Sequence, residues 1–191
     1  MNLKNKKILI TGATGGIGNC LVKKFDELGT SIFATGTNEE KLINLKKTFS
    51  KIHTEKFKLD MHEKIEEFID KVEKDLSGID VLINNAGLGR GFYKIYKTNR
   101  KDISTTIDTN VVAFLQLLRF ITPNMLKDKK CHIVNIGSIA GLYPLSSSVY
   151  GGSKGAVHLI SQNLRIELSG TGVRCTEINP GRVDTEFFDI A

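Results

Sequence analysis

The chain has 191 residues, a length that suits one well-packed domain and is short for two. Its share of hydrophobic residues, 40%, excludes a disordered or fibrous protein. No apolar run approaches the length needed to cross a bilayer. Three apolar residues, at positions 8–10, follow the N-terminal lysines, which is too few for a signal peptide. We therefore expect one cytoplasmic domain that covers residues 1–191.

The formal net charge of +6 is compatible with nucleic acid, a membrane surface or anionic small molecules as partners. The lysines are spread over every predicted helix and form no block, which favours a solvated surface over a nucleic-acid or membrane site. A phosphorylated cofactor and an anionic substrate both suit this charge. We expect neither a nucleic-acid partner nor a membrane partner.

The cysteines and histidines support neither a disulfide framework nor a metal site. Cys20, Cys131 and Cys175 are odd in number, far apart and in apolar surroundings, which predicts reduced thiols in the core. The four histidines form no HxH or HExxH pair, so we predict no bound metal.

Short apolar runs alternate with amphipathic runs of helical length along the whole chain. We expect strands at residues 7–11, 31–36, 55–59, 80–84, 132–137 and 173–178. Several of these runs are continuously apolar, as in parallel strands that are covered on both faces. Strand–helix units with short links predict an α/β fold, namely a doubly wound parallel sheet in three layers with right-handed crossovers.

The apolar spacing between the strands predicts amphipathic helices. One stripe joins Ile17, Leu21, Phe25 and Leu28, and a second joins Ile65, Phe68, Ile69, Val72 and Leu76. Residues 37–40 have capping-box spacing and open a further helix. The helices at 103–125 and 149–168 are apolar on more than one side, which indicates either loose amphipathicity or a subunit interface.

A glycine-rich turn at residues 11–18 follows the first predicted strand and opens a helix. Glycines allow backbone to approach a pyrophosphate, and free N–H groups at the helix start face its negative charge. The spacing is Gly-xxx-Gly-x-Gly and differs from GxGxxG, and tight turns also collect glycine. As the first turn of an alternating α/β chain, it favours cofactor binding.

Further motifs follow the later strands in order. Asp60 follows the third strand, residues 84–87 (Asn-Asn-Ala-Gly) close the fourth, and Ser138 closes the fifth. Tyr150 and Lys154 form a YxxxK motif, and residues 180–185 (Pro-Gly to Thr) follow the sixth strand. With this set over almost its whole length, the sequence resembles the short-chain dehydrogenases/reductases. The resemblance implies a Rossmann-type sheet and an NAD(P)-dependent oxidoreductase that acts on an alcohol or carbonyl group.

Tyrosine is a poor base at neutral pH because its pKa is about 10, and a nearby ammonium lowers that value. Tyr150 and Lys154 are spaced i, i+4, so Lys154 can supply the charge. The resemblance implies that Tyr150 exchanges the proton, that Lys154 also binds the nicotinamide ribose, and that Ser138 holds the substrate oxygen. It further implies that Asn110 supports Lys154 through a water. Asn110, Ser138, Tyr150 and Lys154 are the predicted catalytic set.

The predicted cofactor contacts follow five of the six predicted strands and include the YxxxK motif. They are Gly12, Thr14, Gly15, Gly16, Ile17, Gly18, Thr37, Asp60, Asn84, Ala86, Gly87, Tyr150, Lys154, Pro180, Gly181, Val183 and Thr185. The aspartate that NAD enzymes of the family carry after the second strand is replaced by Gly36, and the basic residues common in NADP enzymes are replaced by Thr37 and Gly15. Thr37 either binds a 2′-phosphate or caps a helix. The pattern favours NADP over NAD.

For the substrate, residues 149–154 and 179–187 look most like the branch that acts on small 3-hydroxy acids, including serine. Residues 11–18 and 34–37 also resemble 3-oxoacyl-carrier-protein reductases, the alternative. Arg90 and Arg182 either pair with a substrate carboxylate or are solvated loop residues. The basic, aromatic stretch 90–101 is typical of single-stranded nucleic-acid sites, but here it is more simply an active-site rim. The non-enzymatic alternative is a nucleotide-binding sensor or scaffold.

Members of the family generally continue for several dozen residues beyond position 191. By the resemblance, the substrate-covering helices and a seventh strand are missing, which leaves the exact substrate and the physiological direction open. We expect a homodimer or homotetramer formed through the helices at 103–125 and 149–168.

Overall fold

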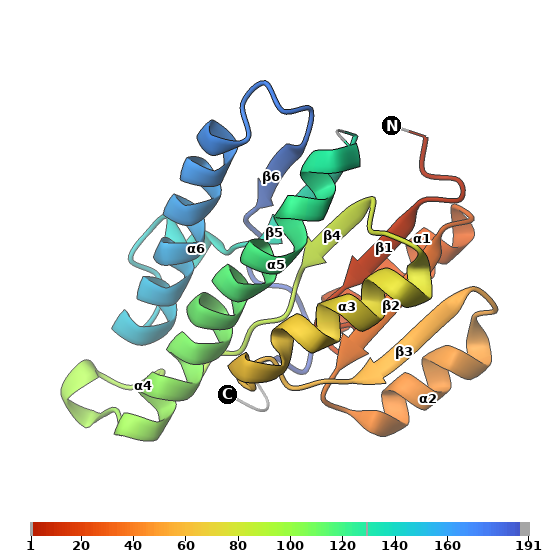
Figure 1. The fold of residues 1–191 in the computed structure, drawn as a ribbon. Coiled ribbons are helices and arrows are strands. Elements are labelled where there is room, and N and C mark those ends of the chain that lie inside the picture. Colours follow the sequence, from red (N-terminus) through yellow and green to blue (C-terminus); the bar gives the residue numbers. More distant parts are fainter. Residues whose placement is uncertain (1, 129, 188–191) are drawn as a thin grey trace.

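The computed structural model describes residues 2–128 and 130–187, which form a six-stranded parallel sheet. The strands are β1 (Lys7–Ile10), β2 (Ser31–Gly36), β3 (Ile52–Lys56), β4 (Val81–Asn84), β5 (His132–Ile136) and β6 (Arg174–Ile178). Their order is β3-β2-β1-β4-β5-β6, and every pair is parallel. The arrowheads in Figure 1 accordingly all point toward one end of the sheet.

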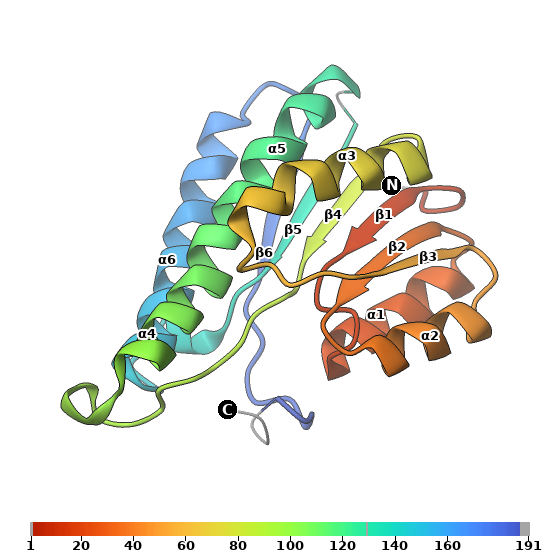
Figure 2. The same ribbon diagram turned by 60° about the horizontal axis from the view of Figure 1, so that its bottom comes forward.

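Helices cover both faces of this sheet, as Figure 2 shows. On one face lie α1 (Gly16–Glu27) and α2 (Glu39–Thr48), and on the other lie α3 (Ile65–Leu76), α5 (Ala113–Asp128) and α6 (Ser148–Glu167). The short helix α4 (Arg100–Ile107) runs into α5 through a π-helical turn, Asp108–Val112. The predicted three-layer, doubly wound α/β architecture is confirmed.

The core is divided by the sheet into two apolar layers, because successive residues of a strand point to opposite faces. Leu9, Phe33 and Leu82 pack under α3, α5 and α6. Ile8 and Ile10, the neighbours of Leu9, pack under α1 and α2. Each such buried side chain stabilises the fold by about 1.5–3 kcal/mol, so the strands anchor both layers.

Four expectations from the sequence were wrong in detail. Strand β3 spans Ile52–Lys56 and not residues 55–59, because Ile52 pairs with Ile32 of β2 while the chain beyond Lys56 leaves the sheet toward α3. Val22 is the fully buried residue of α1 in place of Leu28, which is exposed. The side chain of Asn38, and not of Thr37, caps α2 by accepting from the N–H of Lys41 at 3.0 Å.

The fourth concerns the thiols. Cys131 and Cys175 are buried as expected, but Cys20 lies on the outer face of α1 and is exposed. All three cysteines are free.

The carboxyl ends of the strands define one functional edge. Strand order reverses between β1 and β4, and in doubly wound sheets ligands bind in the crevice at this reversal. The loops that follow β1, β4, β5 and β6 gather at this edge, where α6 also begins. Within the described residues, no helix has the length and apolar character needed to span a bilayer.

Candidate active site

The glycine turn is fastened to the end of β4. The side-chain amide of Asn85 donates to the backbone oxygens of Thr11 at 2.9 Å and of Gly12 at 3.1 Å. In return, the Thr11 hydroxyl oxygen accepts from the N–H groups of Asn85 at 3.1 Å and Ala86 at 3.0 Å. These four hydrogen bonds fix the position of the loop that follows β1 relative to the loop that follows β4.

The glycines of this turn leave a cradle of bare backbone. Gly12 has φ +64°, a conformation that side chains rarely adopt, and a Cβ on Gly18 would overlap the backbone oxygen of Gly12. Gly15 precedes α1 without a side-chain cap, so the first N–H groups of the helix have no such partner. Bare amides at a helix start suit a pyrophosphate, so the residues present fit a dinucleotide.

Two other predicted cofactor residues border the cradle. Thr14 lies against the end of β2, where a Cβ on Gly36 would be 2.5 Å from the Thr14 Oγ1. The methyl group of Thr185 lies where a Cβ on Gly16 would be. The chain that follows β6 therefore returns to the start of α1 and closes one side of the crevice.

Tyr150 lies in the first turn of α6, which Ser147 caps by accepting from the N–H of Tyr150 at 3.2 Å. The residue is 9% exposed, and its ring packs against two others, with centroids 5.5 Å away for Phe92 and 5.8 Å for Phe187. This burial raises the pKa of Tyr150 above its ordinary value, and a hydrogen bond with Ser138 acts in the opposite direction.

Lys154 lies one turn further along α6 and is 6% exposed. Its Nζ donates to the backbone oxygen of Ile136 at 2.9 Å, and a Cβ on Gly87 would lie 3.4 Å from the same nitrogen. Burial lowers the pKa of Lys154 to about 8, and the charge of Glu177 partly opposes that shift. The expected lowering of the Tyr150 pKa by Lys154 is not found: the causes that act on this phenol are its burial, the larger, and the hydrogen bond with Ser138.

Ser138 and Asn110 are positioned by backbone contacts. The N–H of Ser138 donates to Asn179 Oδ1 at 3.0 Å, and the Ser138 Oγ accepts from the N–H of Ala140 at 3.1 Å. Asn110, buried in the π-helical turn, bonds both backbone groups of Leu88 and donates to the Ser153 hydroxyl at 3.0 Å. Asn110 thus fixes the loop that follows β4; its water-mediated support of Lys154 stays a prediction.

The remaining predicted cofactor residues are less closely grouped. Asp60 forms an ion pair with Lys58 at 2.6 Å, and Thr37 is exposed. The side-chain amide of Asn84 turns into the sheet and donates to Asn135 Oδ1 at 3.1 Å. Ala86 and Gly87 follow at the strand end, and Ile17 lies in the first turn of α1. Pro180, Gly181 and Val183 lie in the segment between β6 and Thr185.

Comparison with known proteins gives the same result as this geometry. A model of the short chain dehydrogenase family matches residues 6–190. The NADP-dependent 3-hydroxy acid dehydrogenase YdfG of Salmonella typhi is 39% identical over 186 residues, 96% of this chain and 75% of that protein. The chain belongs to the short chain dehydrogenase family. This dehydrogenase is therefore an oxidoreductase, as its motifs predicted.

Other relatives act on different small molecules. Sulfoacetaldehyde reductase 2 of Chromohalobacter salexigens is 35% identical over 185 residues, 94% of this dehydrogenase and 73% of that protein. The crystal structure of serine dehydrogenase from Escherichia coli superposes with a TM-score of 0.86 at 37% identity, covering 92% of this chain and 82% of that one. A closed form of serine dehydrogenase complexed with NADP+ gives a TM-score of 0.91 at 37% identity, covering 96% and 75%.

Sequence reasoning missed several residues that shape this site. Asn85 lies inside the motif at 84–87. Its hydrogen bond to the glycine turn joins it to Gly12, which is 73 residues away in the sequence, so no local pattern indicates it. Phe92 and Phe187 come from distant loops, and no local pattern pairs them with Tyr150. Glu177 left no clear signal, because its strand β6 alternates exposed and buried residues, so an acid in it does not stand out as buried.

Proposed function

We propose that this dehydrogenase transfers a hydride between NADP(H) and the alcohol or carbonyl group of a small 3-hydroxy acid. The observation that carries the proposal is the meeting of Tyr150, its hydrogen-bond partner Ser138 and the buried Lys154 at the strand ends beside the glycine cradle. A nucleotide sensor or scaffold would need the cradle but not a buried phenol, hydroxyl and ammonium in one place.

The proposed roles follow from the chemistry of each side chain. Tyr150 donates its phenolic proton to a substrate carbonyl oxygen in reduction and takes that proton back in oxidation. Ser138 donates a hydrogen bond to the same oxygen and orients it. Lys154 supplies the positive charge that stabilises the phenolate formed when Tyr150 gives up its proton. A bound nicotinamide cofactor would supply or accept the hydride.

The dinucleotide would be held by the backbone of residues 12–18 at its pyrophosphate and by Lys154 at its nicotinamide ribose. We propose NADP over NAD because β2 ends in Gly36, so no acid stands there to repel a 2′-phosphate. Thr37 is exposed next to it, and Asn38 performs the capping that would otherwise occupy its hydroxyl. Relatives with 38–39% identity are named NADP-dependent, which agrees with this preference.

A small hydroxy acid is the proposed substrate because one relative named above is a 3-hydroxy acid dehydrogenase and both structural neighbours are serine dehydrogenases; sulfoacetaldehyde reductase 2 is the exception among them. The Arg90 side chain is exposed on the loop that also carries Phe92, so a guanidinium is available at the rim of the crevice for a carboxylate. The rings of Phe92 and Phe187 pack against the ring of Tyr150, and this aromatic packing suits a small molecule better than a long acyl chain.

We also propose that two copies associate through α5 and α6. Leu115, Leu159 and Ile166 are 44%, 58% and 74% exposed on the outer faces of these helices. Apolar side chains on an outer helix face are stabilised when a second copy covers them. The oligomeric state in solution, measured by light scattering, checks this interface: a monomer would contradict it.

The experiment that tests the function is a measurement of nicotinamide absorbance with NADP and with NAD. Serine and small 3-hydroxy acids test the proposed substrate class, and a 3-oxoacyl thioester tests the alternative. We expect turnover with NADP and a hydroxy acid. Turnover with the thioester alone would replace the substrate class. Tight binding of cofactor without turnover of any of these compounds would favour the sensor or scaffold.

A further inference from the structure

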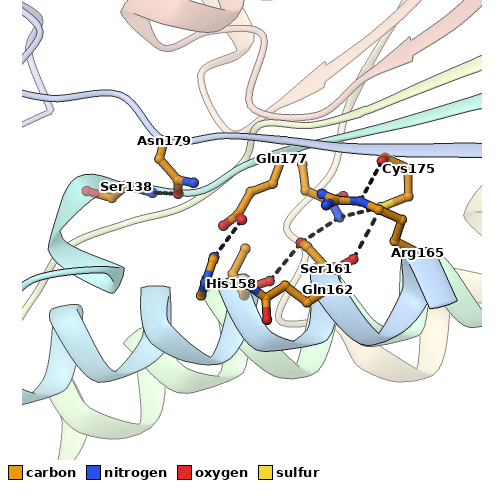
Figure 3. Close-up of polar contacts among 10 residues, drawn as sticks. Ser138, His158, Ser161, Gln162, Arg165, Cys175, Glu177 and Asn179 are labelled. Atoms are coloured by element: carbon orange, nitrogen blue, oxygen red, sulfur yellow. Dashed lines mark hydrogen bonds and ion pairs between the residues drawn. The ribbon is translucent and has the colours of Figure 1, made fainter.

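Glu177 is a carboxylate buried within β6. Its side chain is 5% exposed and reaches toward α6, where its Oε2 lies 2.7 Å from the Nδ1 of His158 (Figure 3). Its Oε1 is also buried and has no hydrogen-bond partner within residues 2–128 and 130–187. Leaving a buried carboxylate oxygen without a partner is costly unless a positive charge faces it.

The neighbours of His158 indicate how Glu177 is held. The Nε2 of Gln162 lies 2.9 Å from the Nε2 of His158. An amide nitrogen donates, so this ring nitrogen accepts, and the proton of a neutral imidazole is then on Nδ1, where it is donated to Glu177. In this arrangement His158 holds the Glu177 carboxylate in place through its Nδ1–H.

The Glu177 carboxylate is directed toward the stripe of α6 that also carries Lys154. Lys154 and His158 are spaced i, i+4 and share one stripe of α6. The Nζ of Lys154 donates to the backbone oxygen of Ile136, and a Cβ on Gly137, the next residue, would be 2.6 Å from Glu177 Oε1. The ammonium and the free carboxylate oxygen thus lie against consecutive residues at the end of β5, and the bare backbone of Gly137 makes room for the latter.

The other titratable groups along this face of α6 and β6 do not replace Glu177. Tyr150 is neutral, and burial raises the pKa of the Cys175 thiol, which stays protonated. Arg165 lies two turns beyond His158, where its Nε donates to the backbone oxygen of Cys175 at 3.3 Å. From β5 the neighbour is an uncharged amide, Asn135, bonded to the Ser161 hydroxyl at 2.9 Å.

We infer that Glu177, held by His158, is a positioning residue whose buried charge keeps Lys154 an ammonium in its place at the end of β5. This inference rests on the proposed function for its catalytic meaning, in which the Lys154 charge stabilises the phenolate that forms when Tyr150 gives up its proton. It predicts that loss of the Glu177 charge makes the ammonium easier to deprotonate and moves the alkaline limit of turnover to lower pH.

The test is a titration of Lys154 itself, in the protein without cofactor or substrate. The side-chain NMR resonances of Lys154, assigned by their absence in Lys154→Met, are followed from neutral to alkaline pH in the parent and in Glu177→Gln. We expect Lys154 to titrate near 8 in the parent and about one pH unit lower in Glu177→Gln. The matched control is Glu167→Gln, which removes a carboxylate from the exposed end of α6 and should leave the titration unchanged.

If Glu177→Gln does not fold, Glu177→Asp replaces it, since Asp keeps the charge but withdraws it from Gly137 by one methylene. A smaller displacement in the same direction is then expected. An unchanged Lys154 titration in whichever variant folds would overturn the inference. The Lys154 titration needs no turnover, so its result is independent of the proposed function. Failure of the proposed function would appear separately, as a parent protein that converts no substrate. If the parent protein is active, the pH at which kcat falls on the alkaline side should shift in the Glu177 variant by the same amount as the Lys154 titration.

Discussion

The ammonium of Lys154 donates a hydrogen bond to the backbone oxygen of Ile136 at 2.9 Å, which ties α6 to the end of β5. Because Lys154 is only 6% exposed, its ammonium is largely desolvated, and this desolvation lowers the free energy of unfolding.

Replacing Lys154 with Met keeps most of the stem and removes the charge. We expect turnover to be lost while the free energy of unfolding at neutral pH rises by about 1–3 kcal/mol. The gain should shrink as pH rises from about 8 toward 10.5, because the folded parent then releases the Lys154 proton while the unfolded chain still carries it. Urea titrations across this range check the sign.

The exposed Lys101 of α4 gives the matched control. Lys101→Met should change neither turnover nor the pH dependence of stability. A Lys154→Met protein that is less stable than the parent at neutral pH would contradict the burial argument.

Tyr150 should respond in opposite directions to two of its neighbours. Phe92→Ala removes part of the burial that raises the Tyr150 pKa, so the pKa should fall toward its ordinary value. Ser138→Ala removes the hydrogen bond that lowers it, so the pKa should rise further. Ultraviolet titration of the phenols, with Tyr150→Phe subtracted, measures both. Shifts of the same sign would show that the environment of Tyr150 is described wrongly.

Gly18 tests the cradle. A Cβ at this position meets the backbone oxygen of Gly12, which cannot move aside cheaply, so Gly18→Ala should weaken NADP binding at least tenfold and destabilise the fold by about 1–3 kcal/mol. Calorimetry and thermal unfolding measure the two effects.

Gly152 of α6 is the control for that substitution, because a Cβ there meets nothing within 4 Å. Gly152→Ala should stabilise the helix by about 0.5–1 kcal/mol and leave cofactor binding intact. Equal loss of binding in both variants would mean that the glycine turn is not the cofactor cradle.

Asn110 tests whether the π-helical turn serves the site. Asn110→Ala leaves the N–H and C=O of Leu88 without their partner, so the free energy of unfolding should fall by about 2–4 kcal/mol and turnover should drop with it. The exposed Asn163 of α6 is a suitable control and should tolerate Ala. A fully stable Asn110→Ala protein would contradict the fastening role.

The fold and the order of the site motifs along the chain could be predicted from the sequence, because both depend on patterns of neighbouring residues. The apolar stripe of α3, from Ile65 to Leu76, is buried as predicted, and continuous apolar runs correctly gave buried parallel strands. The bounds of the edge strand β3 were predicted wrongly because only Ile52 of its five residues is buried, so its apolar signal is weak. Contacts that cross the chain, such as Phe92 and Phe187 on Tyr150, depend on loop paths that no periodicity encodes.

The electrostatics of the site were the least predictable part. The i, i+4 spacing of Tyr150 and Lys154 correctly placed them on one helix, but spacing does not report burial. Burial raises the pKa of one and lowers that of the other, and the counter-charge, Glu177, comes from a strand 23 residues further along the chain.

The role of Tyr150 as proton donor and acceptor is tested most directly by comparing the turnover of Tyr150→Phe and Tyr143→Phe with NADP and the best hydroxy-acid substrate. Tyr143 is 61% exposed in the loop before α6, so its loss should leave the rate unchanged. Loss of the Tyr150 hydroxyl should lower kcat by about 10²–10⁴-fold while cofactor still binds. A Tyr150→Phe enzyme that turns over at the parent rate would contradict the assignment of Tyr150 as the proton donor and acceptor.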